Sequence, residues 1–131
     1  MYTSYFANIK NLPDDLILIS ICRSKPLWFN GICYYDVAPT YSILSDYKNG
    51  KINEKQYKIR YIRDILFNKN PYRVIENVIE LCFQNGLDKI ETSKICFLCY
   101  EKPDKFCHRH IFADWLNACK YDVREYKSEV T

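Results

Sequence analysis

The chain contains a continuous run rich in β-branched residues, Leu16-Ile17-Leu18-Ile19-Ser20-Ile21. A run of this kind is typical of a strand that is covered on both faces, as strands of parallel sheets are. A second run of the same character lies far along the chain, Ile95-Cys96-Phe97-Leu98-Cys99. Two buried strands with helical sequence between them predict a layered α/β domain.

Helical start signals separate these two runs. Asn53 followed by Gln56 forms a capping box, and Pro71 directly after Asn70 is typical of a first helical position. These signals and the apolar stripes predict helices at residues 40–49, from 53 with Ile59, Ile62 and Leu66 on one side, from 70 to near Gly86, and at 107–119. Short strands are expected at residues 2–6 and 123–126. We therefore expect residues 1–131 to form a single three-layer α/β domain, with a mostly parallel sheet flanked by helices.

Composition narrows the class of protein. The chain has 131 residues, of which 48% are hydrophobic, and a formal net charge of +3. This charge is too small to require a nucleic acid as partner. No apolar run approaches the roughly 18 residues of a membrane span. We expect no secretory signal at the start of the chain, and seven cysteines without one predict a cytoplasmic protein with reduced thiols.

Residues 23–39 have no helical or strand periodicity. This stretch contains Pro26, Trp28, Gly31 and Pro39, and it is long for a connection in a small domain. Long loops on a rigid scaffold often carry function, so we expect residues 23–39 to be an active-site loop.

Polar side chains follow both buried runs. Cys22, Arg23 and Ser24 come after the first run, and Tyr100 and Glu101 come directly after Cys99 at the end of the second. Ligand sites of parallel sheets lie beyond the carboxyl ends of the strands. We therefore expect Arg23, Ser24, Cys99 and Glu101 to meet at one edge of the sheet.

The predicted helix at 107–119 opens with Cys107-His108-Arg109. Cys107 and His108 continue the buried stripe of this helix, whereas Arg109 is expected to reach over the rim. A helix N-terminus attracts anions and favours the thiolate form of a cysteine. This predicts Cys107 as nucleophile, His108 as its base or orienting partner, and Glu101 as an acid or positioning group.

Other interpretations of these residues stay open. Arg23 and Arg109 have the charge to form structural ion pairs with Glu101 or Asp104. A redox pair of Cys99 with Cys107, or of Cys22 with either, is an alternative because strand end and helix start lie close together.

A zinc site is a further alternative, since the Cys and His residues from 96 to 110 have a spacing that resembles a metal cluster. Cys96 and Cys99 lie three residues apart in an expected strand, however, and would point to opposite faces. We expect no metal ion and no cofactor.

The basic residues between Lys51 and Arg63 alternate with Tyr57 and Tyr61, which is a pattern of some nucleic-acid-binding helices. Glu54 and Asp64 dilute this charge, so a solvated helix face is favoured over a nucleic-acid interface.

The stretch Leu98-Cys99-Tyr100-Glu101-Lys102-Pro103, followed by Cys107-His108-Arg109, resembles the C-terminal signature of the uncharacterised "domain of unknown function 488" family. The apolar strand ending in Arg23, with Pro26 and Trp28 after it, resembles the N-terminal part of the same family. The opening of the chain is similar to a small-domain branch. Typical members have an Asp before this Arg, where the present chain has Cys22. The resemblance implies the fold and the site, but no established reaction.

We expect the site to bind a phosphate-bearing or otherwise anionic small ligand such as a nucleotide or nucleoside derivative, and the sequence leaves open whether the site also processes this ligand chemically. Arg23, Arg109 and the N–H groups at the start of the helix would hold the anion, and Ser24 and Cys99 would line the site. Trp28 or a tyrosine of the long loop would stack on a planar ring. The rival hypotheses are a non-catalytic module that sequesters or senses such a ligand, and a nucleic-acid-interacting protein.

Overall fold

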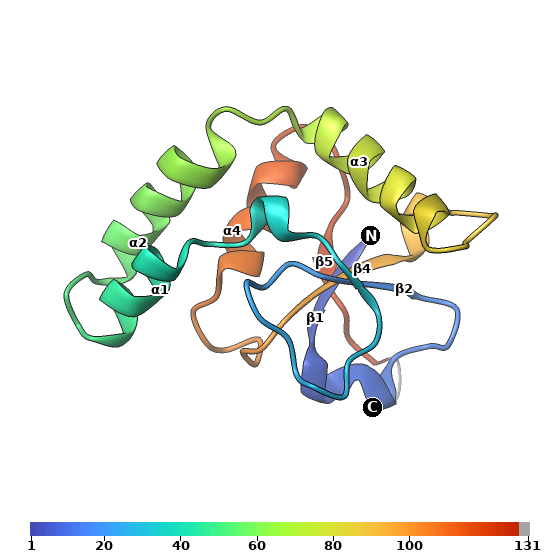
Figure 1. Ribbon diagram of the computed structural model, residues 1–131, viewed down its shortest axis with the longest axis horizontal. Helices are drawn as coiled ribbons and strands as arrows, with labels where there is room; N and C mark the ends of the chain where they lie inside the picture. The colour runs from blue at the N-terminus through green and yellow to red at the C-terminus, as the bar shows by residue number, and fades with distance from the viewer. Residues whose placement is uncertain (129–131) are drawn as a thin grey trace.

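A computed structural model describes residues 1–128. Within them, one sheet is formed by β1 (Tyr2–Tyr5), β2 (Ile17–Ser20), β3 (Ile32–Cys33), β4 (Ile95–Cys99) and β5 (Arg124–Glu125). The strand order is β3-β2-β4-β1-β5, and each neighbouring pair is parallel (Figure 1). The predicted α/β domain is confirmed, and the mostly parallel sheet is parallel throughout the described residues.

The helices follow the predicted order. They are α1 (Tyr41–Lys48), α2 (Glu54–Tyr61), a π-helical turn that continues α2 (Ile62–Leu66), α3 (Pro71–Gln84) and α4 (His108–Asn117). Short 3-10 helices span Phe6–Asn11, Tyr35–Val37 and Thr92–Lys94. The predicted caps are present. Asn53 accepts the Gln56 N–H at 2.8 Å while the Gln56 side chain accepts the Asn53 N–H, and Asn70 accepts the N–H groups of Tyr72 and Arg73.

Two details differ from the prediction. The stretch 23–39, which was expected to be a loop, contains β3 and a 3-10 turn. The sequence did not reveal β3, because a strand of two residues is too short to show a periodic pattern. In α2 and its π-helical continuation, the buried stripe consists of Tyr57, Tyr61 and Ile65, which are spaced by four residues, together with Leu66, which is buried as predicted. Ile59 and Ile62 are exposed, so the predicted stripe was wrong at both positions.

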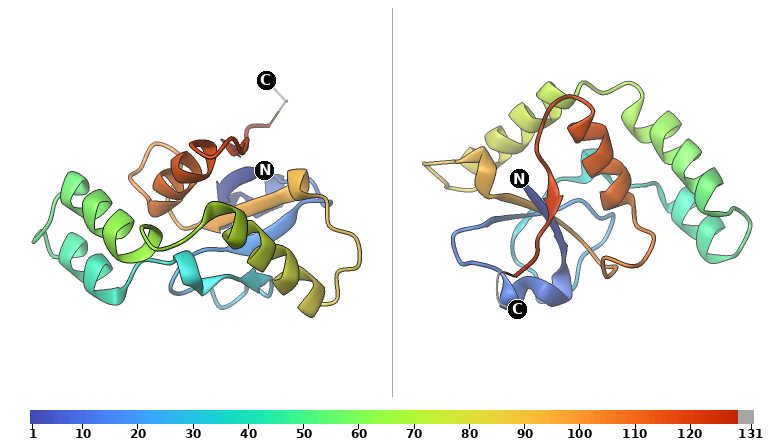
Figure 2. Two further views of the ribbon diagram at one scale, coloured as in Figure 1. Left: turned by 90° about the horizontal axis from the view of Figure 1, so that it is seen from above. Right: turned by 180° about the vertical axis from the view of Figure 1, so that it is seen from behind.

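The two faces of the sheet are covered by different layers. Figures 1 and 2 show α1 to α4 on one side of the sheet and the 3-10 helix that follows β1 on the other. Ile19 and Phe97 pack into the helical layer, whereas Leu98 packs with Phe6 and Phe29 on the opposite side. All five residues of β4 are buried, as expected for a strand covered on both faces.

The topology places a crevice at the carboxyl ends of β2 and β4. These strands are adjacent, with Ser20 opposite Leu98. The chain leaves β2 toward its outer neighbour β3, whereas it leaves β4 through α4 toward β5 at the other edge. Such a switch in direction is where ligands bind in open α/β sheets. The hairpin of α1 and α2 projects beyond the sheet (Figure 2) and supplies one wall there.

Among the described residues, no helix combines the length and the apolar character needed to cross a membrane.

Phe112 of α4 is fully buried and meets Phe97 of β4 edge-on, with ring centroids 5.0 Å apart. We expect Phe112→Ala to lower the free energy of unfolding by about 3 to 5 kcal/mol, because it leaves a cavity between α4 and the sheet. Phe83→Ala, at a half-exposed position of α3, should cost about 0.5 kcal/mol or less. Denaturant unfolding followed by circular dichroism measures both, and equal losses would contradict this assignment of the core.

Candidate functional site

A pocket of about 170 Å³ lies at the carboxyl ends of β2 and β4. Six of the eight predicted site residues line it: Arg23 and Ser24 after β2, Cys99 and Glu101 at the end of β4, and Cys107 and His108 at the start of α4. Segments about 80 residues apart in sequence therefore meet at one edge of the sheet, where the strand order requires them to meet.

An aromatic wall closes one side of the pocket. Its members are Tyr47 of α1, Tyr57 of α2 and Phe106 before α4. Their ring centroids lie 4.9 to 5.3 Å apart, and Tyr57 is buried. Sequence reasoning missed this wall because it placed Tyr57 on a solvated face. The four-residue spacing of Tyr57 and Tyr61 was the signal that marked them as buried.

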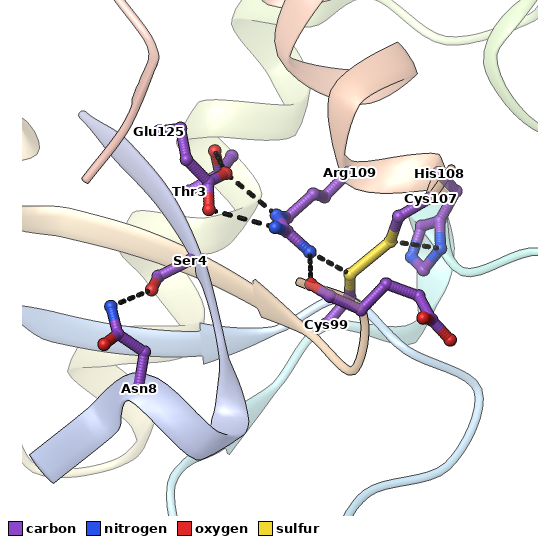
Figure 3. Close-up of polar contacts among 9 residues, drawn as sticks. Thr3, Ser4, Asn8, Cys99, Cys107, His108, Arg109 and Glu125 are labelled. Carbon is purple, nitrogen blue, oxygen red and sulfur yellow. Dashed lines mark hydrogen bonds and ion pairs between the residues drawn. A yellow bond between two sulfur atoms is a disulfide. The ribbon is translucent and has the colours of Figure 1, made fainter. Parts of the chain in front are cut away.

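Two of the lining cysteines, Cys99 and Cys107, form a disulfide across the crevice (Figure 3). They lie eight residues apart in the chain, one at the end of β4 and one at the N-cap of α4. Cys22 also lines the pocket as a free thiol, and burial raises its pKa to about 12. Cys22 is therefore a neutral thiol near pH 7.

His108 is buried and held in one tautomer. Its Nε2 lies 2.7 Å from the carbonyl oxygen of Ile21, which can only accept a hydrogen bond, so Nε2 carries the proton. Nδ1 is then free of a proton and faces the Cys107 sulfur at 3.8 Å. Burial lowers the pKa of His108 to about 4, so the ring is neutral near pH 7. His108 is therefore a proton acceptor toward Cys107 and does not stabilise its thiolate as a cation.

Arg109 does not reach over the rim, and this prediction was wrong. The residue is fully buried, because the first turn of α4 lies against β1 and β4. Its Nε and Nη2 donate to the two carboxylate oxygens of Glu125, each at 2.9 Å. Its Nη1 donates to the Cys99 sulfur at 2.8 Å and to the carbonyl oxygen of Glu101. The partner in its ion pair is therefore Glu125 of β5, and neither Glu101 nor Asp104.

Glu125 is itself held by the neighbouring strand β1. The hydroxyl of Thr3 on β1 donates to its Oε1 at 2.7 Å. Figure 3 shows the resulting chain of contacts from Thr3 through Glu125 and Arg109 to Cys99. A bidentate pair of this kind compensates the charge of a guanidinium that has no contact with water.

Arg23 is half-buried at the pocket. Its Nε donates to the Pro39 carbonyl at 3.1 Å and its Nη2 to the Ala38 carbonyl at 3.0 Å. Within residues 1–128 it makes no ion pair, and its Nη1 makes no hydrogen bond. The backbone therefore fixes this guanidinium while its charge stays uncompensated. Ser24 and Glu101 are exposed at the mouth of the pocket.

Trp28 lies outside the residues that line the pocket. It is 60% exposed and meets Phe6 edge-on at 6.4 Å. Phe6 in turn contacts Tyr100, which does line the pocket, at 4.9 Å. The side chain of Phe6 thus lies between Trp28 and Tyr100 of the pocket lining.

The basic stretch from Lys51 to Arg63 presents no stacking surface. Its two tyrosines are buried, and the Tyr61 hydroxyl donates to the Val37 carbonyl. Arg60 pairs with Asp46, and Arg63 pairs with Asp64. Among residues 1–128, no group of three or more His, Cys, Asp or Glu side chains is placed to hold a metal ion.

Comparison with known protein families found a match over most of the chain. The family model of DUF488-N3a, described as "Active DUF488-N3 subclade", matches residues 19–120. The chain belongs to the DUF488-N3a family. No curated protein and no solved structure matches the chain. The DUF488-N3a match contains all eight predicted site residues, but it excludes β1 and β5, which supply Thr3 and Glu125.

The buried His108 makes stability depend on pH. Because its folded pKa of about 4 lies below its ordinary value of 6.5, the unfolded chain binds a proton that the folded chain does not. We expect the free energy of unfolding to fall between pH 6.5 and 4, with a contribution from His108 on the order of 3 kcal/mol.

His108→Gln is the matched variant, because its amide N–H can replace the Nε2 donor to Ile21 without titrating. The difference between wild type and variant in urea unfolding at pH 7.5, 6, 5 and 4.5 isolates the histidine from the carboxylates. Parallel pH dependences of the two proteins would show that His108 is not buried in its neutral form.

Proposed function

We propose that this DUF488-N3a protein binds a small anionic ligand with a planar ring, of the nucleotide or nucleoside class, and that Cys107 reacts with it. One observation carries the proposal: a single pocket combines an aromatic wall, an uncompensated guanidinium and a Cys–His pair.

The size of the pocket supports a ring rather than a whole nucleotide in its interior. Sites for complete drug-sized ligands have volumes of about 300 to 1,000 Å³, whereas this pocket has about 170 Å³. A base or a sugar would lie against Tyr47, Tyr57 and Phe106. The rest of the ligand would extend past the mouth.

Arg23 supports an anionic group at that mouth. Its guanidinium is fixed by the Ala38 and Pro39 carbonyls, so little side-chain entropy is lost when an anion binds its remaining donors. The N-terminus of α4 adds positive potential beside it. The Glu101 carboxylate would repel phosphate, and its role in the proposal is to accept hydrogen bonds from N–H or O–H groups of the ligand.

Cys107 and His108 support a reaction. Nδ1 of His108 can take the proton of the reduced Cys107 thiol, while the Ile21 carbonyl keeps the ring oriented. The low pKa of His108 makes the imidazolium short-lived, which favours return of the proton to a leaving group. The word "active" in the description of the matched family agrees with a role beyond binding.

The binding arm of the proposal is tested by thermal shift of the reduced protein. The panel is nucleoside mono- and diphosphates, nucleosides, sugar phosphates and inorganic phosphate. A ligand at 100 times its Kd stabilises by about 2.7 kcal/mol, which raises Tm by several degrees. Arg23→Gln should abolish the shift for anionic ligands. Arg60→Gln, which removes a paired arginine of α2, should leave the shift unchanged. Equal shifts in all three proteins would contradict an anion site at Arg23.

The reaction of Cys107 is tested with the ligands that give a thermal shift. We expect Cys107→Ser to keep the thermal shift but to lower turnover of the ligand at least about 100-fold, because a hydroxyl is a far weaker nucleophile than a thiolate. Cys33→Ser changes a free cysteine outside the pocket lining and serves as control. Binding without turnover in the wild type would instead favour a sequestering or sensing module.

A further inference from the structure

We infer that the pocket also carries a thiol–disulfide exchange activity, in which a low-molecular-weight thiol attacks Cys107 and Cys99 leaves as a thiolate beside Arg109. This activity is independent of the identity of the anionic ligand. It rests on the Cys99–Cys107 disulfide, on its place in the pocket wall, and on the contact of Arg109 with only one of its sulfurs.

The two sulfurs have different surroundings. Cys107 is 7% exposed and lies next to the unprotonated Nδ1 of His108. Cys99 is 1% exposed and receives a hydrogen bond from Nη1 of Arg109. Disulfide exchange depends on access to the attacked sulfur and on stabilisation of the departing thiolate. Cys107, the more exposed of the two pocket-lining sulfurs, is therefore the attacked sulfur, and Cys99 is the leaving group.

Arg109 is placed to stabilise the departing thiolate of Cys99. Two of its donors are occupied by Glu125, which holds the guanidinium in place. The third nitrogen, Nη1, is directed at the Cys99 sulfur. A cation at hydrogen-bond distance from a buried sulfur strongly favours a thiolate over a thiol. Arg109 thus acts as a positioning residue for the charge that develops when the disulfide opens.

The third sulfur in the pocket does not compete. Cys22 is hydrogen-bonded to the carbonyl oxygen of Leu98, and none of the hydrogen bonds of Arg109 goes to its sulfur. The raised pKa of Cys22 keeps it protonated near pH 7, so it is a poor nucleophile toward the disulfide. The exchange is therefore confined to the Cys99–Cys107 pair.

The reaction balances with two thiol molecules. A thiolate RS⁻ attacks Cys107 Sγ, the S–S bond breaks, and its electron pair leaves on Cys99 Sγ. A second RS⁻ attacks the small-molecule sulfur of the mixed disulfide, so that RSSR leaves and Cys107 becomes a thiolate. The protons of the two RSH molecules end on the protein dithiol. The protein disulfide is reduced, and the small thiol is oxidised to its disulfide.

The direction of attack is tested with glutathione as the probe and no other ligand present. Wild type is oxidised, mixed with reduced glutathione, quenched in acid and mapped by mass spectrometry. We expect the mixed disulfide on Cys107 at least tenfold more often than on Cys99, and a linked Cys99–Cys107 peptide before reduction. Cys33→Ser should behave as wild type. Absence of the linked peptide in the oxidised protein, or glutathione found mainly on Cys99, would overturn the inference.

The role of Arg109 is tested by two substitutions with opposite expected effects. Arg109→Met removes the cation and should lower the reduced fraction at a fixed glutathione ratio, by about tenfold or more in the equilibrium constant. Glu125→Gln removes the compensating anion and should raise the reduced fraction. A merely structural role would move both variants in the same direction. If Arg109→Met does not fold, the measurement on Glu125→Gln alone is the test. A fall in the reduced fraction of Glu125→Gln would contradict the stabilisation of the Cys99 thiolate by Arg109.

These experiments are separate from the tests of the proposed function. The exchange is measured without anionic ligand, and ligand binding is measured on protein that is already reduced. Failure of one therefore leaves the other standing.

Discussion

A guanidinium without contact to water imposes the strictest constraint on this structure. Removing such a charge from water costs several kcal/mol unless partners replace the lost hydration. Arg109 of α4 obtains them from three partners: the carboxylate of Glu125 on β5, the sulfur of Cys99 on β4 and the carbonyl of Glu101 in the loop after β4. β1 contributes indirectly through Thr3. The start of α4 therefore has one place on the sheet, and the pocket is formed against that fixed point.

The chemistry of the pocket follows from the burial of its titratable side chains. His108 is neutral because burial lowers its pKa to about 4, and Cys22 is protonated because burial raises its pKa to about 12. In such surroundings, a sulfur becomes an anion only where a specific cation faces it. Arg109 provides that cation for Cys99, whereas Cys107 depends on proton transfer to a histidine. Two neighbouring thiols are thus given different reactivities by their immediate contacts.

The sequence predicted the parts of the site that depend on strand topology. The proximity of Arg23 and Glu101 could be predicted because the carboxyl ends of parallel strands meet at one edge of the sheet. The orientation of Arg109 could not be predicted, since its partner lies 16 residues away in a two-residue strand without a readable pattern. Tyr57 was misplaced because charged neighbours on both sides concealed its burial. The position of Trp28 outside the pocket lining could not be predicted, because no local rule says where a tryptophan in a loop packs.

The strand order has a consequence for the sequence of events in folding. β1 is the first strand of the described chain, yet its two neighbours are β4 and β5, the last ones. In its register, Tyr2 faces Cys96 and Thr3 faces Glu125. Contacts so distant along the chain form late and slow the search for the native state. On the ribosome, β1 would wait unpaired until β4 and β5 emerge. The carboxylate that neutralises Arg109 would arrive at the same late moment.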